Sequence, residues 1–276
     1  MVLLPPMVTK NEPGVTPLNV WDIATGKVAM DLEAPFPDAS KPRPNWPCHF
    51  IVSANASVAA SEANCSSVVI AYSLDSGKIL HRFSWPPAML HGRRHADGAA
   101  SLALSRDGRY LAIGGLFGEL YIYDVHTGEK LRTMASSPVW KEVKVAAVAF
   151  SPDAKFVATT VPCVKLRETK RFRSYEFVDG LCGNLVNVWR LHDGKLIASY
   201  PPSTMGEPLH LSWSPKGKYL AIVAADKTVR IWSLRNPNDP GVVMNFKNKG
   251  VTRAAFSPNG EYLAVLSRNL LIFHTP

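Results

Sequence analysis

The chain has 276 residues, 46% of them hydrophobic, and 31 Lys and Arg residues against 22 Asp and Glu give it a net charge of +9. This length and composition suit one large buried core, and the basic balance favours acidic partners without identifying them. The first ten residues lack a basic segment followed by a long apolar run, so we expect no signal peptide and no membrane anchor or membrane partner. We therefore expect a cytoplasmic protein, with the nucleus as the alternative.

Residues 1–33 predict an incomplete first sheet. Two apolar runs, 18–23 and 27–32, read as strands around a tight Thr-Gly turn, and residues 1–8 form at best one further strand interrupted by prolines. An alternative places the first four residues beside the last sheet of the chain as its outer strand. The segment that follows, 34–48, holds five prolines and predicts a stiff loop.

Residues 49–85 and 99–135 each predict a four-stranded antiparallel sheet, because short apolar runs alternate with turns of the Asp-Gly and Thr-Gly kind. The third run of the second sheet, Leu120–Val125, does not alternate with polar residues. A strand that is apolar on both sides is covered on both faces, so this sheet is expected to stack between two others. A second long loop, 86–98, separates the two sheets.

Residues 143–200, 209–246 and 251–276 repeat the same pattern. The first of them carries a large insertion at 161–183 between its second and third strands, and the last holds three strands before the sequence ends. Six repeats are therefore expected, at residues 1–33, 49–85, 99–135, 143–200, 209–246 and 251–276.

Two sequence signatures recur in these repeats. A Ser-containing corner joins the first two strands, as in Ser214-Pro215-Lys216-Gly217, and an aromatic residue stands at a fixed place in the third strand. The spacing from Trp189 to Trp232 and on to Phe273 is close to the roughly 40–45 residues of a propeller blade.

On these residues the chain resembles the WD40-repeat family of β-propellers. The resemblance rests on Val20-Trp21-Asp22, Tyr123-Asp124, Ile231-Trp232-Ser233 and the Ser-Pro corners. It implies an all-β, WD40-like β-propeller of about six recognisable blades, the first and last incomplete, in one domain over 1–276. It also implies that the protein is a scaffold for other proteins.

The sequence departs from the family pattern, since Trp21-Asp22 is its one literal Trp-Asp pair and the usual Gly-His pair is absent. We therefore expect a reduced polar network within the blades, with Asp226 and Trp232 as its best remnant, and cohesion that rests on apolar packing. The residues expected to be structural are Trp21, Asp22, Tyr123, Asp124, Trp189, Asp226 and Trp232.

The three long connections share one face of the predicted propeller. In an antiparallel blade, the loop between the second and third strands and the loop to the next blade emerge on the same face. The segments 34–48 and 86–98 connect successive blades, and 161–183 connects a second strand to a third. Long loops inside compact domains are usually functional or disordered, and on one rim of a repeat fold they suit a binding face.

The insertion in the fourth repeat mixes basic and aromatic residues. This pattern suits an acidic protein surface, with Arg and Tyr as anchors, and equally the backbone and bases of a nucleic acid. An ordinary extended hairpin with solvated charges is the third interpretation. Together with three residues of the loop 86–98, the predicted partner-binding residues are Arg93, Arg94, His95, Lys165, Arg167, Lys170, Arg171, Phe172, Arg173 and Tyr175.

No motif for catalysis, nucleotide binding or zinc occurs in the sequence. His91 and His95 lie in a loop with a glycine between them, so they are poorly placed to converge on a metal. Four irregularly spaced cysteines predict free thiols. We therefore expect no catalytic residue, no metal and no cofactor, and interpret the protein as a non-enzymatic scaffold. A nucleic-acid or polyanion binder is the alternative, and a small-ligand-binding or enzymatic propeller is the third choice.

The predicted strands number fewer than a closed ring of six or seven blades requires. The exposed seam would be costly, because apolar faces and strand edges would meet water. We therefore expect the chain to belong to a larger propeller or to be completed by another chain or copy. An irregular ring closed by the proline-rich segments is the alternative.

Overall fold

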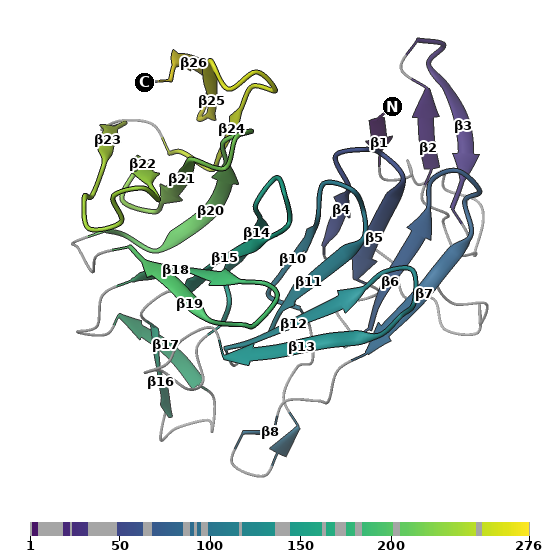
Figure 1. Ribbon diagram of the computed structural model, residues 1–276, viewed down its shortest axis with the longest axis horizontal. Coiled ribbons are helices and arrows are strands. Elements are labelled where there is room, and N and C mark those ends of the chain that lie inside the picture. Colours follow the sequence, from purple (N-terminus) through teal and green to yellow (C-terminus); the bar gives the residue numbers. More distant parts are fainter. Residues whose placement is uncertain are drawn as a thin grey trace. The chain divides into compact units, whose positions relative to one another are not determined.

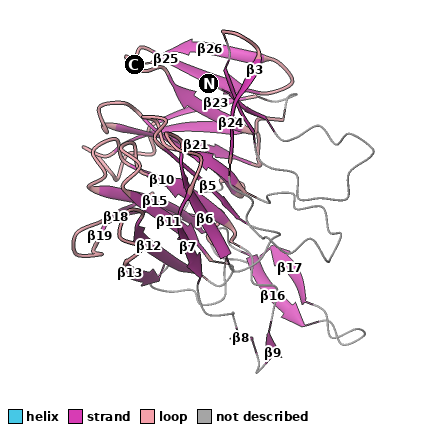
Figure 2. Cartoon of the chain, turned by 90° about the vertical axis from the view of Figure 1, so that its right-hand side faces the viewer, coloured by secondary structure: helices cyan, strands magenta, loops and turns pink. Residues whose placement is uncertain are grey.

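The described residues of this computed structural model form strands and loops, with no helix among them (Figure 2). The structure describes residues 2–4, 19–22, 24–32, 49–62, 68–84, 89–90, 93–94, 99–115, 118–135, 144–161, 164–168, 175–179, 184–200, 205–246 and 250–275. By their contacts they divide into one compact unit of residues 1–99, 107–109 and 124–129 and a second unit of residues 100–106, 110–123 and 130–276.

The first unit holds two antiparallel sheets (Figure 1). The three-stranded one has the order β1 (Val2–Leu4), β2 (Asn19–Asp22) and β3 (Lys27–Asp31). The four-stranded one has the order β4 (Phe50–Val52), β5 (Val58–Glu62), β6 (Val68–Ser73) and β7 (Ile79–Ser84).

The N-terminal strand decides between the two placements that the sequence left open. Leu3 of β1 pairs with Val20 of β2, so β1 is part of the first sheet. The N-terminal strand therefore belongs to the first sheet and not to the last one.

Most of the remaining strands belong to four sheets in which each strand pairs with its predecessor in the sheet. The third sheet is β10 (Ser101–Leu104), β11 (Tyr110–Gly114), β12 (Glu119–Asp124) and β13 (Lys130–Ala135). The fourth is β14 (Ala147–Phe150), β15 (Phe156–Val161), β18 (Leu185–Arg190) and β19 (Leu196–Ser199). The fifth is β20 (Pro208–Trp213), β21 (Tyr219–Ala224), β22 (Thr228–Ser233) and β23 (Val242–Asn245). The sixth is β24 (Arg253–Phe256), β25 (Tyr262–Leu266) and β26 (Leu270–His274).

Two short hairpins stand outside these sheets. β16 (Val164–Glu168) pairs with β17 (Tyr175–Asp179) inside the predicted insertion. β8 (Met89–Leu90) pairs with β9 (Arg93–Arg94), where the sequence predicted only a loop, because the pattern of two-residue strands is too short to detect.

The core of the second unit lies between successive sheets, and each central strand serves two of these interfaces. In β21, Leu220 and Ile222 pack toward the fourth sheet, while Ala221 and Val223 pack toward the sixth. All four side chains are fully buried. Alternate residues of one strand thus fill two different core clusters, which explains why the central strands are apolar on both sides.

The Ser corners share one hydrogen-bond pattern. Ser214 Oγ accepts a hydrogen bond from the Tyr219 N–H at 3.0 Å, and the corners at Ser105, Ser151 and Ser257 have the same bond. The structure adds a fifth corner at Ser53, whose Oγ accepts from the Val58 N–H at 3.0 Å. The detectable signal there is Ser followed two residues later by Asn.

The polar network differs from the expectation about Asp226 and Trp232. Asp226 accepts hydrogen bonds from the N–H groups of Gly206 and Thr228, and Trp232 Nε1 donates to the Pro237 carbonyl at 3.1 Å. A Trp–Thr link occurs instead in the fourth sheet, where Trp189 Nε1 donates to Thr159 Oγ1 at 3.0 Å. Both of these tryptophans therefore bond to acceptors within their own blades.

Candidate functional site

Of the predicted partner-binding residues, five lie in the two short hairpins and five lie outside the described residues. The backbone places Lys165 and Arg167 on β16 and Tyr175 on β17, and Arg93 and Arg94 form β9. The remaining members of the set lie outside the described residues, namely His95, Lys170, Arg171, Phe172 and Arg173.

The β16–β17 hairpin is an addition to a sheet that is complete without it. β15 pairs directly with β18 from Phe156↔Arg190 to Val161↔Leu185. The chain leaves β15, forms the hairpin with Arg167 opposite Glu176, and returns at β18. The fourth sheet therefore makes no use of the hairpin in its own strand order.

The residues expected to be structural vary in burial. Trp232 is fully buried, Tyr123, Asp124 and Trp189 are nearly so, and Trp21, Asp22 and Asp226 are half-buried. Trp232 meets the ring of Tyr200 edge to face, with the ring centroids 5.4 Å apart.

The half-buried and buried carboxylates stabilise turns. Burial by itself would raise the pKa of Asp124, but the Thr127 and His126 N–H groups and the Arg109 side chain outweigh it and lower this pKa. Burial would also raise the pKa of Asp226, but hydrogen bonds that Thr228 and Gly206 donate to the carboxylate lower this pKa overall. Both groups therefore remain ionised and act as acceptors of local hydrogen bonds.

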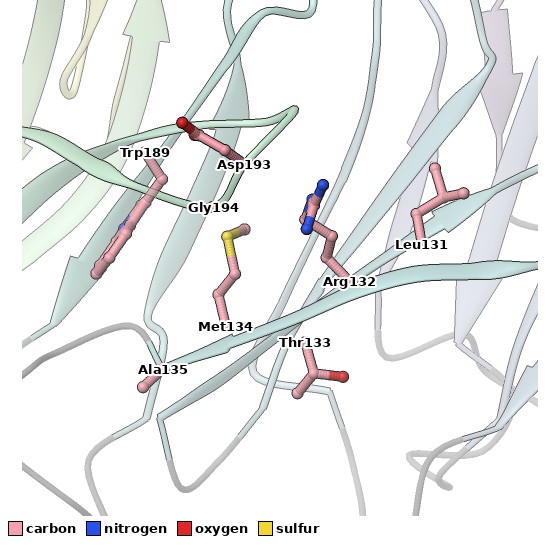
Figure 3. Close-up of a pocket in the computed structure, with 8 residues that line it drawn as sticks. All are labelled: Leu131, Arg132, Thr133, Met134, Ala135, Trp189, Asp193 and Gly194. Atoms are coloured by element: carbon pink, nitrogen blue, oxygen red, sulfur yellow. The ribbon is translucent and has the colours of Figure 1, made fainter.

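A groove of about 480 Å³ lies beside β13, next to the turn that joins β18 to β19 (Figure 3). Met134 and Trp189 form an apolar wall, and Asp193 and Arg132 bring opposite charges to the opening. Its lining residues are Leu131, Arg132, Thr133, Met134, Ala135, Trp189, Asp193 and Gly194.

The two charged side chains of the groove are already engaged by the protein. Arg132 Nε donates to the Leu191 carbonyl at 3.0 Å, and its guanidinium also contacts the His192 carbonyl. Asp193 pairs with Arg190 at 3.1 Å. The groove has the volume of a ligand site, but its lining offers no paired nucleophile and base.

The groove could not be predicted from the sequence, because its two walls come from different sheets. The one available signal is the run Lys130–Met134, where charged and apolar residues alternate in an outer strand. That pattern predicts a strand with one solvent-exposed face, and it contains no information about the turn between β18 and β19 that lies next to it.

Glu62 is a buried acid in the first unit. Its Oε1 accepts a hydrogen bond from the Ala99 N–H at 2.6 Å, and its Oε2 lies 3.9 Å from His49 Nε2. Burial raises the pKa of Glu62 to about 7 and also lowers that of His49. Both side chains therefore lose most of their charge near neutral pH, which limits the electrostatic attraction between Glu62 and His49.

His210 on β20 is a second group with a displaced pKa. Burial, with a contribution from the positive charge of Arg253, lowers the pKa of His210 to about 4. Its Nδ1 is buried and has no hydrogen-bond partner within the part of the chain that the structure describes. The imidazole is therefore neutral at physiological pH, as a packed histidine is.

The described residues contain no group of three or more His, Cys, Asp or Glu side chains that would suit a metal ion. His91 and His95, which the sequence raised as weak metal candidates, lie outside the described residues, as do the four cysteines. Within the described ranges, no helix is long and apolar enough to cross a membrane.

Comparison with known proteins identifies one repeat directly. Residues 194–233, from the turn after β18 to the end of β22, match the family model described as "WD domain, G-beta repeat". In structure, the chain is similar to hydrazine synthase of Kuenenia stuttgartiensis, with a TM-score of 0.63 over 94% of this chain and 77% of that one at 15% identity. This likeness concerns the fold alone, and the predicted all-β, WD40-like fold class is confirmed.

Curated proteins match at low identity. The U3 small nucleolar RNA-associated protein 18 homolog of Mus musculus is 25% identical over 79% of this chain and 35% of its own length. Actin-interacting protein 1 of Caenorhabditis elegans is 22% identical over 53% of this chain and 20% of its own. Cilia- and flagella-associated protein 52 of Chlamydomonas reinhardtii is 35% identical over 33% and 15%. The chain thus spans about a third or less of the length of these relatives.

Proposed function

We propose that this chain, a WD40-repeat protein, is a non-enzymatic scaffold that binds partner proteins through the loops inserted into its blades. The observation that carries the proposal is the β16–β17 hairpin, which is added to a sheet whose strands already pair without it. A hairpin that the sheet does not require is free to serve recognition.

The charge of the chain supports acidic partner surfaces. The net charge is +9, and the segment 165–173 holds five basic residues. Electrostatic complementarity of this kind steers association and selects partners.

A deletion tests this proposal. Replacing residues 165–181 by an Asn-Gly turn should leave the melting temperature nearly unchanged, because loop length changes closure entropy only slightly. Partner recovery in affinity purification should fall. A matched control replaces the five basic residues by Gln and keeps the hairpin. Loss of stability with unchanged binding per folded molecule would show that the hairpin is structural.

Nucleic acid is the second candidate partner. It is favoured by a specific observation, the alignment of 79% of this chain with a relative named for association with a small nucleolar RNA. A basic surface that releases counterions from phosphates loses affinity steeply as salt rises. Titration of a fluorescent single-stranded RNA between 50 and 200 mM salt, roughly the range in which such losses are large, separates this candidate from a protein partner.

We also propose a location in the cell and an assembly with a further chain. We expect the protein in the cytoplasm, or in the nucleus if RNA is the partner, and imaging of a tagged chain tests this. We also expect the blades to be completed by another chain or a further copy. The sixth sheet, which has three strands in the described part of the chain, supports this expectation.

A further inference from the structure

A buried carboxyl group holds the residue that follows the loop 86–98. Glu62, the last residue of β5, is 1% exposed. Its Oε1 accepts a hydrogen bond from the Ala99 N–H at 2.6 Å, and Ala99 comes directly after that loop in the chain. Both residues belong to the first unit, so this contact lies within one compact part of the protein.

His49 lies beside this contact. The Glu62 N–H donates to the His49 carbonyl at 3.0 Å, which extends the pairing of β4 with β5 by one residue pair. His49 Nε2 is 3.9 Å from Glu62 Oε2. Burial lowers the pKa of His49, and a hydrogen bond between the imidazole and the Ala99 backbone opposes that lowering. The Ala99 backbone is therefore held by both side chains.

The contact is complete with the protonated form of Glu62. Its Oε2 is buried and has no hydrogen-bond partner in the part of the chain that the structure describes. In the protonated acid the Oε2–H faces the neutral imidazole of His49, and a shift of about 1 Å brings the two atoms to an ordinary hydrogen-bond distance. In the ionised form the Ala99 N–H is the one bonded donor, and a buried charge without further partners is costly. Ionisation therefore favours an arrangement in which the carboxylate reaches water.

No counter-charge for Glu62 comes from the other described elements around it. Across the sheet Glu62 pairs with Val69 of β6, which is apolar. Its neighbour Ser61 lies 3.5 Å from the hydroxyl group of Tyr72. Burial raises the pKa of Glu62 to about 7 against the opposing hydrogen bond from Ala99, and no charged side chain of the described residues contributes. His49 is thus the titratable group that faces this carboxyl.

We propose that Glu62 and His49 form a proton-controlled clamp on Ala99, which is closed while the carboxyl holds its proton and opens when the carboxyl ionises. Ala99 comes five residues after Arg94 of β9, so the clamp anchors the segment that carries β8 and β9. Arg93 and Arg94 belong to the predicted partner-binding residues. For them this inference rests on the proposed function, and partner binding through this segment should depend on pH. A contact made by a few local hydrogen bonds opens far more readily than the whole fold, which suits regulation.

Hydrogen exchange of the Ala99 amide tests the clamp in the full chain at pH 6 and pH 8, after correction for the intrinsic exchange rate. With a Glu62 pKa of 4.5 in the open form and about 7 in the closed form, opening should be about tenfold more frequent at pH 8, and the protection of Ala99 should fall by that factor. The Val58 amide, which bonds to Ser53 Oγ at the other end of β5, is the control and should keep its protection. Glu62→Gln keeps an acceptor for Ala99 and does not ionise, so its Ala99 protection should be equal at both pH values.

Three results would overturn the proposal. Equal protection of Ala99 at pH 6 and pH 8 in the unchanged chain means that the carboxyl does not control the contact. A fall that persists in Glu62→Gln assigns the pH dependence to another group. If that variant does not fold, the carbon-13 shift of the Glu62 carboxyl is followed from pH 4 to pH 9 in the unchanged chain, and a midpoint below pH 6 refutes the clamp. These measurements need no partner, so their outcome is independent of the affinity purification that tests the scaffold proposal.

Discussion

Trp232 provides a quantitative test of how the blades cohere. Its side chain is fully buried between the fourth and fifth sheets, packs edge to face on Tyr200, and donates a hydrogen bond to the Pro237 carbonyl. Truncation of a buried tryptophan to alanine costs about 3–5 kcal/mol, and the cost is highest where the site cannot collapse. Tyr200 is held by its own hydrogen bond to the Pro240 carbonyl at 2.8 Å, so the cavity should persist.

We therefore expect Trp232→Ala to lower the free energy of unfolding by about 4–5 kcal/mol, which includes the lost aromatic pair. Urea unfolding followed by far-ultraviolet circular dichroism measures this loss. Trp232→Phe should cost less, since it keeps an aromatic ring and leaves a smaller cavity, together with the loss of the donor to the Pro237 carbonyl. Val243→Ala, at a 46% exposed position of the same sheet, is the control and should cost under about 1 kcal/mol. A Trp232→Ala protein of normal stability that fails only in partner binding would refute the structural role.

Three further predictions concern a corner and two buried titratable groups. Ala154 has a φ of 53° where the equivalent corner has Gly217, so Ala154→Gly should raise stability by up to about 1 kcal/mol. Gly217→Ala should lower stability by about 1 kcal/mol because the φ of Gly217 is 67°, and the new methyl group has room, with its nearest neighbour at 3.8 Å. Melting temperatures equal to that of the unchanged chain would contradict the predictions for Ala154 and Gly217. Because the pKa of Glu62 is raised from 4.5 to about 7, its contribution to stability is present below pH 4.5 and lost as pH rises through 7. Glu62→Gln should therefore stabilise the chain at pH 8 and not at pH 4, and a pH-independent effect would argue against a titrating carboxyl. Because the pKa of His210 is lowered from 6.5 to about 4, its contribution is present above pH 6.5 and lost as pH falls toward 4. His210→Gln should flatten that acid limb of the stability profile, and an unchanged limb would assign it to other groups.

The alternation of apolar runs and turns was sufficient to locate the six sheets, because hairpin pairing is local in the sequence, but it missed the two-residue strands β8 and β9. The predicted runs at 18–23, 27–32 and 120–125 lie within one residue of β2, β3 and β12. The insertion at 161–183 was also found from the sequence, since the pattern stops after β15 and resumes at β18. The division into a single domain and the roles of the chosen residues stay predictions.

Tertiary structure decided the features that depend on which sheet meets which. The placement of β1 was open in the sequence, because a three-residue strand carries no register of its own, and pairing with β2 settled it. The groove beside β13 and the acceptor of Trp232 Nε1 depend on turns brought close by packing. The strands β22 and β26 carry apolar residues at the same alternate positions, so the sequence by itself does not distinguish their surroundings. Val229 and Ile231 of β22 are buried because the sixth sheet lies against them, and burial is a property of the neighbours that a strand meets.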